Sequence, residues 1–236
     1  MRNSLLILVF LCLSSLPAFS QHETDNWFFG YHAGITFQNG WRQEIQGGQT
    51  NTREGTAVIS DKTTGDLLFY TDGMTVWNNQ HRIMVNGIGL KGGVSCTQSA
   101  LIVPNPANPL QYYVFTAPDL TPGTGITALY YSIVSLELPG GKVMNKNTLL
   151  IDGVSEKLTG TMDCAGTGFW VVTHHKQRSE FYSFHITVSG IDTRPVVSTY
   201  SGEISDYTLG YMKISPSRTK LALASGTNGG YLSLFD

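Results

Sequence analysis

The chain has 236 residues, of which 41% are hydrophobic, 11% are aromatic and only 14% are charged. This low charge, together with 26 glycines and 9 prolines, excludes intrinsic disorder, a coiled coil and a helical bundle for most of the chain. The net charge of −2 gives no electrostatic reason to expect nucleic acid or an anionic membrane as a partner. A β-rich protein, long enough to bury a core, remains.

Residues 1–20 have the pattern of a secretory signal peptide. One basic residue near the start is followed by the apolar stretch Leu5–Leu13, which is too short to span a bilayer. Ala18 and Ser20 place small residues at the two positions that a signal peptidase reads. We therefore expect cleavage before Gln21 and export to the medium or the outer cell surface. No later apolar stretch is long enough to cross a membrane.

The chain has three cysteines. Cys12 lies inside the signal and lacks the small preceding residue of a lipoprotein, so no lipid anchor is expected. Cys96 and Cys164 remain after cleavage and could pair in an oxidising compartment, or remain two separate thiols. Neither belongs to a Cys-x-x-Cys pair, so no metal site is expected from them.

Beyond the signal, a strand–turn–strand unit recurs four times. The first unit has strands expected at Thr56–Ile59, Leu67–Thr71 and Thr75–Trp77. The second has Ala100–Val103, Tyr112–Thr116, Ala128–Val134 and a weaker Lys142–Met144. The third has Leu158–Met162, Phe169–Thr173, Phe181–Ile186 and a weaker Val196–Ser198. The fourth has Tyr211–Ile214, Leu221–Ala224 and Tyr231–Phe235. Turns rich in Asp, Asn, Gly, Pro and Ser separate the first two strands of each unit, which predicts hairpins.

The period of the repeat indicates the fold class. The second strands end at Thr71, Thr116, Thr173 and Ala224, which are 45, 57 and 51 residues apart. Four antiparallel strands in about 50 residues are typical of one blade of a β-propeller. A single β-sandwich, the alternative, would not predict four recurrences of the same unit. We therefore expect an all-β propeller in which the equivalent residues Phe69, Val114, Val171 and Leu223 are buried between neighbouring blades.

Several segments also resemble a known family. They are Asn26–Gly30, Ala33–Phe37, Glu54–Ala57, Gly65–Gly73, Val76–Asn78, Thr97–Pro104 and Trp170–His174. Together they resemble the secreted WD40-like β-propeller proteins of the Bacteroidetes, which are often multi-domain surface proteins linked to gliding motility or type IX secretion. The resemblance implies that residues 21–236 are a partial WD40-like β-propeller domain, and it implies no catalytic motif.

The resemblance also shapes the expected architecture. The chain stops at Asp236, inside the third strand of the fourth unit and without the C-terminal sorting module of the family. We therefore expect either an N-terminal fragment of a longer protein with downstream domains or the product of a truncated gene. About four blades are visible, so we expect an open arc rather than a closed ring. Residues Asn26–Phe37 are expected to complete the last blade of the parent protein.

The residues that carry chemistry are few. Neighbours on a strand point to opposite faces, so His174 and His175 are expected to be a solvated loop pair rather than metal ligands. Asp72-Gly73 lacks the spaced oxygen ligands of a calcium loop and predicts a tight turn. No metal, no cofactor and no catalytic residue is expected.

The tryptophans are mostly expected to be structural. Trp27, Trp77 and Trp170 lie in β runs, where burial between blades is expected. Trp41 lies in a turn, so it is the tryptophan expected to be exposed, with ligand stacking as an alternative role.

The predicted function is a secreted, non-enzymatic binding or scaffold module with an unknown protein or glycan ligand. Propellers bind through loops at one face of the central channel. The loops before each first strand and after each second strand supply six candidate residues: Glu54, Asp72, Gln98, Asp119, Lys157 and His174. The alternative is an extracellular glycan-acting hydrolase with its site on the same face; acidic residues converging with an aromatic in a deep pocket would favour it.

Overall fold

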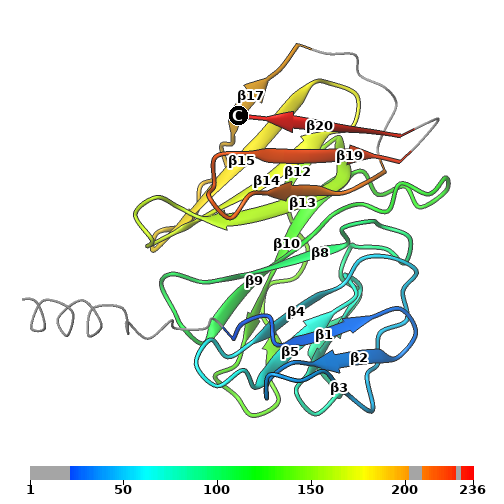
Figure 1. The fold of residues 1–236 in the computed structure, drawn as a ribbon, viewed down its shortest axis with the longest axis vertical. Coiled ribbons are helices and arrows are strands. Elements are labelled where there is room, and N and C mark those ends of the chain that lie inside the picture. The colour runs from blue at the N-terminus through cyan, green and yellow to red at the C-terminus, as the bar shows by residue number, and fades with distance from the viewer. Residues whose placement is uncertain (1–21, 202–208, 227–229) are drawn as a thin grey trace, which may run out of the picture.

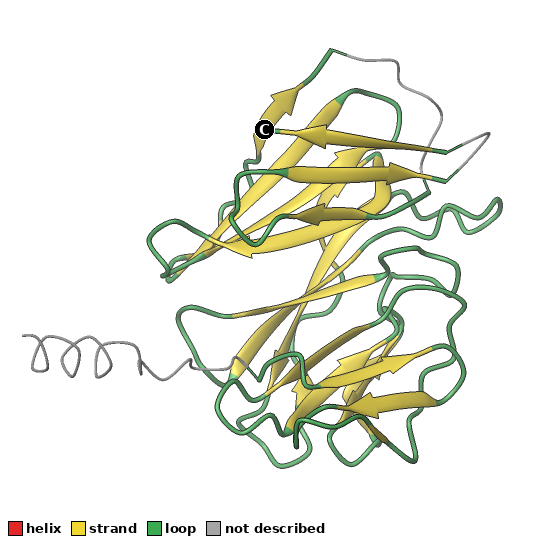
Figure 2. Ribbon diagram, viewed as in Figure 1, coloured by secondary structure: helices red, strands yellow, loops and turns green. Residues whose placement is uncertain are grey.

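The computed structural model describes residues 22–201, 209–226 and 230–236, so the predicted signal peptide and its cleavage site lie outside the described residues. Within these ranges the secondary structure consists of strands β1–β20 and contains no helix (Figures 1 and 2). The described part of the chain accordingly has no helix that could cross a membrane. The predicted all-β class is confirmed.

The strands form five antiparallel meanders in chain order, numbered here 1 to 5. Meander 1 has β1 (Asn26–Phe29), β2 (Ala33–Thr36) and β3 (Gln43–Glu44). Meander 2 has β4 (Ala57–Ser60), β5 (Leu67–Thr71), β6 (Thr75–Asn78) and β7 (Ile83–Ile88). Meander 3 has β8 (Ala100–Pro104), β9 (Gln111–Thr116), β10 (Ala128–Ser135), β11 (Lys142–Val143) and β12 (Thr148–Asp152). Meander 4 has β13 (Val154–Met162), β14 (Phe169–His175), β15 (Glu180–Thr187), β16 (Gly190–Ile191) and β17 (Val196–Thr199). Meander 5 has β18 (Met212–Ile214), β19 (Leu221–Ser225) and β20 (Tyr231–Phe235).

The four units predicted from the sequence correspond to meanders 2 to 5. In each of them the first strand pairs antiparallel with the second, and the second with the third. The sequence pattern missed β7, β12 and the two-residue strands β3 and β16. β7 and β12 expose most of their residues, so neither has the apolar alternation that marks a half-buried strand.

The first hairpin of each of these meanders is closed by a side-chain oxygen at an equivalent turn position. Asp61 Oδ1 accepts hydrogen bonds from the backbone N–H groups of Thr63 and Thr64 at 2.8 and 2.9 Å. The equivalent acceptors are Asn105 Oδ1, Asp163 Oδ1 and Ser215 Oγ. Short polar side chains at these positions stabilise tight turns, so the repeat extends to the turn chemistry.

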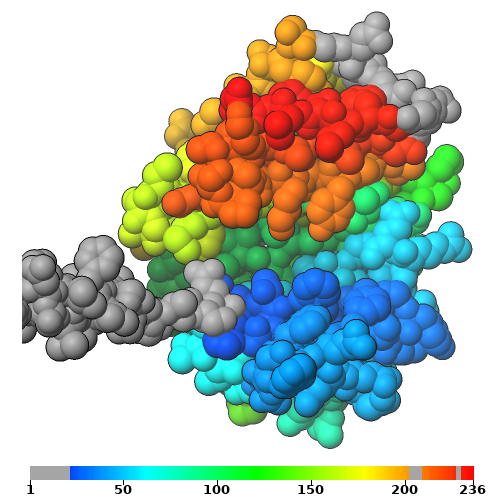
Figure 3. Space-filling view, in the orientation of Figure 1, coloured from blue at the N-terminus to red at the C-terminus, as the bar shows by residue number. Residues whose placement is uncertain are grey.

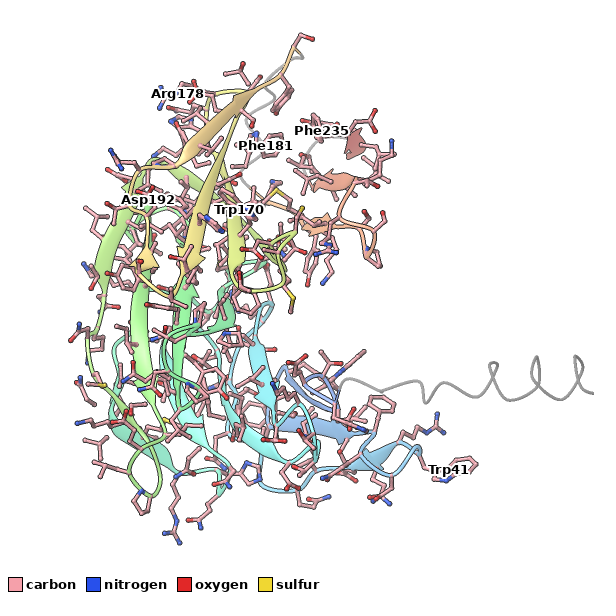
Figure 4. The ribbon with its side chains drawn as sticks, turned by 90° about the vertical axis from the view of Figure 1, so that its left-hand side faces the viewer. Trp41, Trp170, Arg178, Phe181, Asp192 and Phe235 are labelled. Atoms are coloured by element: carbon pink, nitrogen blue, oxygen red, sulfur yellow. The ribbon has the colours of Figure 1, made fainter. Side chains whose placement is uncertain are left out.

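Consecutive meanders pack face to face. The first strands β1, β4, β8, β13 and β18 lie side by side in chain order, and one hydrophobic cluster fills each interface. The equivalent residues Phe69, Val114 and Val171 are fully buried and Leu223 is 3% exposed, as predicted. Meanders 2 and 3 are joined into one nine-stranded sheet by a parallel bridge between Val85 and Lys142. Figure 4 shows the meanders following a C-shaped curve.

The solvent exposure of the tryptophans agrees only in part with the prediction. Trp77 is buried and Trp41 is 78% exposed, as predicted. Trp27 is 53% exposed, so its predicted burial is wrong. The neighbouring Phe28 fills the interface with meander 2, where it stacks on Tyr70 at 4.1 Å, and the alternation of a strand turns Trp27 to the other face. Trp170 is only half-buried.

Candidate functional site

The five first strands line one cavity of about 680 Å³. Three exposed aromatic side chains contribute to its wall: Trp27 and Phe29 from β1, and Tyr211 from the residue before β18. Glu54, Gln98 and Lys213 are among its polar lining residues. Figure 3 shows the surface hollowed between meander 1 (blue) and meander 5 (orange to red). Sequence reasoning missed these aromatic residues, because their exposure depends on which meanders lie at the two ends of the curve.

The loops that precede the first strands are bonded to one another around one end of this cavity. The backbone N–H of Gly55 donates to the carbonyl of Cys96 at 3.1 Å, and Ser99 Oγ donates to the carbonyl of Gly55 at 2.7 Å. A Cβ atom at Gly55 would lie 2.4 Å from the backbone nitrogen of Ser99, so this approach requires glycine. The loops are therefore fixed by their backbones.

Gln98 joins two later meanders through its side-chain amide. Its Oε1 accepts hydrogen bonds from the backbone N–H groups of Leu158 at 3.1 Å and Met212 at 2.7 Å, and its Nε2 donates to the Met212 carbonyl at 3.1 Å. Gln98 is 8% exposed, so these are buried bonds that connect the segment before β8 to β13 and to β18. Buried polar groups of this kind fix one packing arrangement because an unpaired partner is costly.

Two buried carboxylates hold the same loops. Glu156 accepts from the backbone N–H and hydroxyl of Thr97 at 2.8 and 3.0 Å and from the backbone N–H of Leu120 at 3.1 Å. Burial raises the pKa of Glu156 although these bonds oppose the rise. Asp119 accepts from the backbone N–H groups of Ser95 and Thr121. Burial acts to raise the pKa of Asp119, but its hydrogen bonds and the nearby Arg53 lower it overall.

Lys157 is fully buried beside Glu156. Its Nζ donates to the carbonyl of Leu209 at 2.7 Å, which connects β13 to the segment before β18. Burial lowers the pKa of Lys157 to about 8, although the charge of Glu156 partly opposes this. The adjacent pair thus contacts both neighbours of meander 4: Glu156 reaches meander 3 and Lys157 reaches meander 5.

His174 and His175 are not a solvated loop pair, and that prediction is wrong. They are the last residues of β14 and are only 7% and 8% exposed. His174 Nε2 lies 2.9 Å from the Tyr200 hydroxyl, and its ring packs edge-on against Phe181. His175 faces the opposite side, against Tyr182. β14 extends two residues beyond the predicted end, because β15 and β13 continue to pair with it there.

Asp72 and Gly73 form the predicted tight turn. Asp72 Oδ1 accepts from the backbone N–H groups of Met74 and Thr75 at 2.9 and 2.8 Å, and Gly73 has a φ of 89°, which favours glycine. Burial raises the pKa of Asp72, while these hydrogen bonds oppose the rise. The Asp72 carboxylate therefore stabilises the turn.

The six candidate residues occupy two kinds of position. Glu54 and Gln98 line the cavity, although Gln98 is itself buried. Asp72, Asp119, Lys157 and His174 are buried in contacts within the protein and do not line it. Ligand contact by any of the six stays a prediction. No group of three or more His, Cys, Asp or Glu side chains in the described ranges is placed to hold a metal ion.

The two cysteines of the described chain are free. Cys96 is buried and Cys164 is exposed, so the alternative of two separate thiols holds. Burial raises the pKa of the Cys96 thiol, and the charge of Glu156 raises it further, so the thiol is neutral and unreactive.

Comparison with protein family models, curated proteins and solved structures finds no match for this chain.

Proposed function

We propose that this chain is a secreted or cell-surface, non-enzymatic binding module built on a partial β-propeller, with the central cavity as its ligand-binding face. The observation that carries the proposal is the cavity of about 680 Å³, whose wall combines the exposed Trp27, Phe29 and Tyr211 with a few polar side chains. Mostly apolar walls with few polar groups are typical of ligand sites.

The propeller interpretation is supported by three independent regularities. The strand–turn–strand unit recurs with equivalent buried residues, the first strands lie side by side, and each interface has its own hydrophobic cluster. In this interpretation each meander is a blade, and the C-shaped succession in Figure 4 is an open arc of blades. Meander 1 then acts as a blade of its own, beyond the four units predicted from the sequence.

The positions of the carboxylates favour a binding function over glycan hydrolysis, because most of them are occupied by hydrogen bonds within the protein. A hydrolase needs a carboxylic acid and a carboxylate facing the substrate. Asp72, Asp119 and Glu156 instead accept two or three hydrogen bonds each from the loops around them. Glu54 is the only one of the candidate carboxylates that lines the cavity, and Glu23, before β1, is the other acidic residue of its lining.

Arrays of oligosaccharides and peptides, probed with the purified chain, test the proposal. The double variant Trp27→Ala/Tyr211→Ala should lose ligands that the wild type retains, because it removes two of the three exposed aromatic side chains of the cavity wall. Trp41→Ala is the matched control, since Trp41 is also an exposed aromatic residue but lies in a turn of meander 1 outside the cavity lining. Retention by the double variant of every ligand that the wild type binds, or cleavage of a glycan by the wild type, would contradict the proposal.

Export is tested separately. We expect mature protein to begin at Gln21, because Ala18 and Ser20 frame the cleavage site after a short apolar stretch. N-terminal sequencing of protein recovered from the medium or the cell surface measures this. Protein that retains Met1 in the cytoplasm would refute secretion. The proposed membership of the secreted WD40-like propeller proteins, with their links to motility or secretion, depends on the same result.

A further inference from the structure

A second cavity, distinct from the central one, lies between meanders 4 and 5. It has a volume of about 460 Å³, within the range of small-molecule sites. Phe181, Phe235 and Tyr200 close one end, with ring centroids about 5 Å apart. Trp170 from β14 and Arg218 from the β18–β19 turn also line it. Figure 4 shows Trp170, Phe181 and Phe235 around this space, which we call the inter-sheet groove.

Trp170 is held rigidly in the groove and is not used by the core. Its ring stacks on His185 with centroids 4.3 Å apart and an interplanar angle of 9°, and His185 Nε2 lies 3.1 Å from Asp163 Oδ2. On the other strand that flanks β14, the neighbour of Trp170 is Thr161, and both side chains line the groove. None of the hydrophobic clusters found in the described chain includes Trp170.

Arg218 occupies a backbone position that ordinarily favours glycine. Its φ is 63°, and the equivalent turn position of meander 4 is Gly166, with a φ of 70°. Residues other than glycine that are held in this region tend to occur at functional sites, and their strain persists only where the surrounding structure fixes the backbone. One guanidinium N–H donates to the Asp163 carbonyl at 2.9 Å, and the others donate to no described residue.

The remaining lining of the groove is suited to hydroxyl-rich ligands. Thr161, Ser183, Ser198 and Thr219 supply hydroxyl groups, and Lys220 adds a cation that is paired with Asp236. Arg218 and Lys220 also line an adjoining cavity at the β18–β19 hairpin, to which Lys213 contributes as well. This local excess of positive charge contrasts with the net charge of −2 of the whole chain.

We propose that the inter-sheet groove binds an acidic saccharide, with a pyranose ring stacked on Trp170 and its carboxylate bound by Arg218. The C–H face of a pyranose is apolar and loses water favourably against an indole ring. The planar guanidinium binds a carboxylate through two parallel hydrogen bonds. The hydroxyl side chains of the groove match the ring hydroxyls. A neutral sugar has no carboxylate to bind the Arg218 guanidinium, so the groove selects uronic acids over neutral sugars.

Isothermal titration calorimetry with the full chain tests this proposal, with oligogalacturonate as the acidic probe and an oligogalactoside of equal length as its neutral counterpart. Wild type should bind the acidic probe at least tenfold more tightly, and the difference should shrink as salt rises. Trp170→Ala should weaken both probes tenfold or more. Arg218→Gly should reduce acidic-probe affinity to the neutral level, whereas Arg218→Lys should retain part of the preference.

Arg218→Gly is the decisive variant because glycine relieves the positive φ, so the melting temperature should not fall enough to explain the loss of binding. Trp41→Ala should bind both probes as wild type does, because Trp41 lines neither the groove nor the central cavity. The proposal is overturned if neither probe binds, if both bind equally, if Arg218→Gly binds normally, or if Trp27→Ala loses binding while Trp170→Ala keeps it.

Discussion

His174 is the histidine whose ionisation its surroundings alter most among the described residues. Burial lowers its pKa to about 4, and the charges of Lys157 and His175 lower it further. Its Nδ1 is buried without a hydrogen-bond partner in the described chain, while Nε2 lies next to the Tyr200 hydroxyl. The imidazole is therefore neutral in the folded protein at pH 7, and it is a packing element between β14 and the segment after β17.

This burial predicts a loss of stability in mild acid. The unfolded chain takes up a proton on His174 near pH 6.5, whereas the folded protein resists protonation until about pH 4. Stability is then fully present above pH 6.5 and falls by roughly 2–4 kcal/mol as the pH decreases through that window. Thermal melts of wild type and His174→Gln from pH 7.5 to 4.5 measure it, and the variant should show the shallower slope.

Other groups titrate in the same pH range. The contribution of His174 is therefore measured by the difference in stability between wild type and His174→Gln at each pH. Burial raises the pKa of Glu156, which makes its own contribution to stability decrease as the pH rises. Both proteins contain Glu156, and the subtraction removes its contribution. Parallel melting curves for wild type and His174→Gln would show that His174 does not carry the predicted dependence.

At the scale of elements, the second strand of each meander is the central packing unit. Val171 in β14 is fully buried in the cluster between meanders 3 and 4. Val171→Asp should cost on the order of 4 kcal/mol, because it buries a charge without a partner, and this is a large share of a domain's stability. Urea unfolding measures the loss. Val196→Asp on β17 is the control, because Val196 is 56% exposed and tolerates a charge. Equal stability of the two variants would contradict the repeat alignment.

At the scale of the whole molecule, the meanders at the two ends of the curve expose apolar surface. In β20, Leu232 and Leu234 are 74% and 66% exposed, and no charged residue interrupts the strand. Exposed apolar strands favour association. We expect the 236-residue chain to self-associate with rising concentration, and Leu232→Lys/Leu234→Lys to reduce that association. Sedimentation velocity under reducing conditions measures it.

The matched control for that experiment lies on another strand. Val85 and Ile88 of β7 are 71% and 60% exposed, but β7 pairs with β11 rather than lying at an end of the curve. Val85→Lys/Ile88→Lys should therefore associate as the wild type does. A compact wild-type monomer at all concentrations, with a scattering profile of a closed ring, would disprove both the association and the open arc.

The sequence alone determined the β class, the four repeating units, the buried residues Phe69, Val114, Val171 and Leu223, and the exposure of Trp41. These properties follow from local patterns: apolar alternation marks a strand, and Asp, Asn, Gly and Pro mark a turn. The strand signal failed at β7 and β12, because their residues are mostly exposed and carry no alternation.

Only the tertiary structure decided which faces remain uncovered. Trp27 and Trp170 lie in β runs like Trp77, yet the neighbouring meanders cover Trp77 and leave the other two in cavities. His174 and Lys157 are polar residues that the sequence pattern placed in loops. Both are buried, because the strands and loops of adjacent meanders cover them. Burial depends on contacts between residues far apart in the chain, and a local pattern contains no information about those partners.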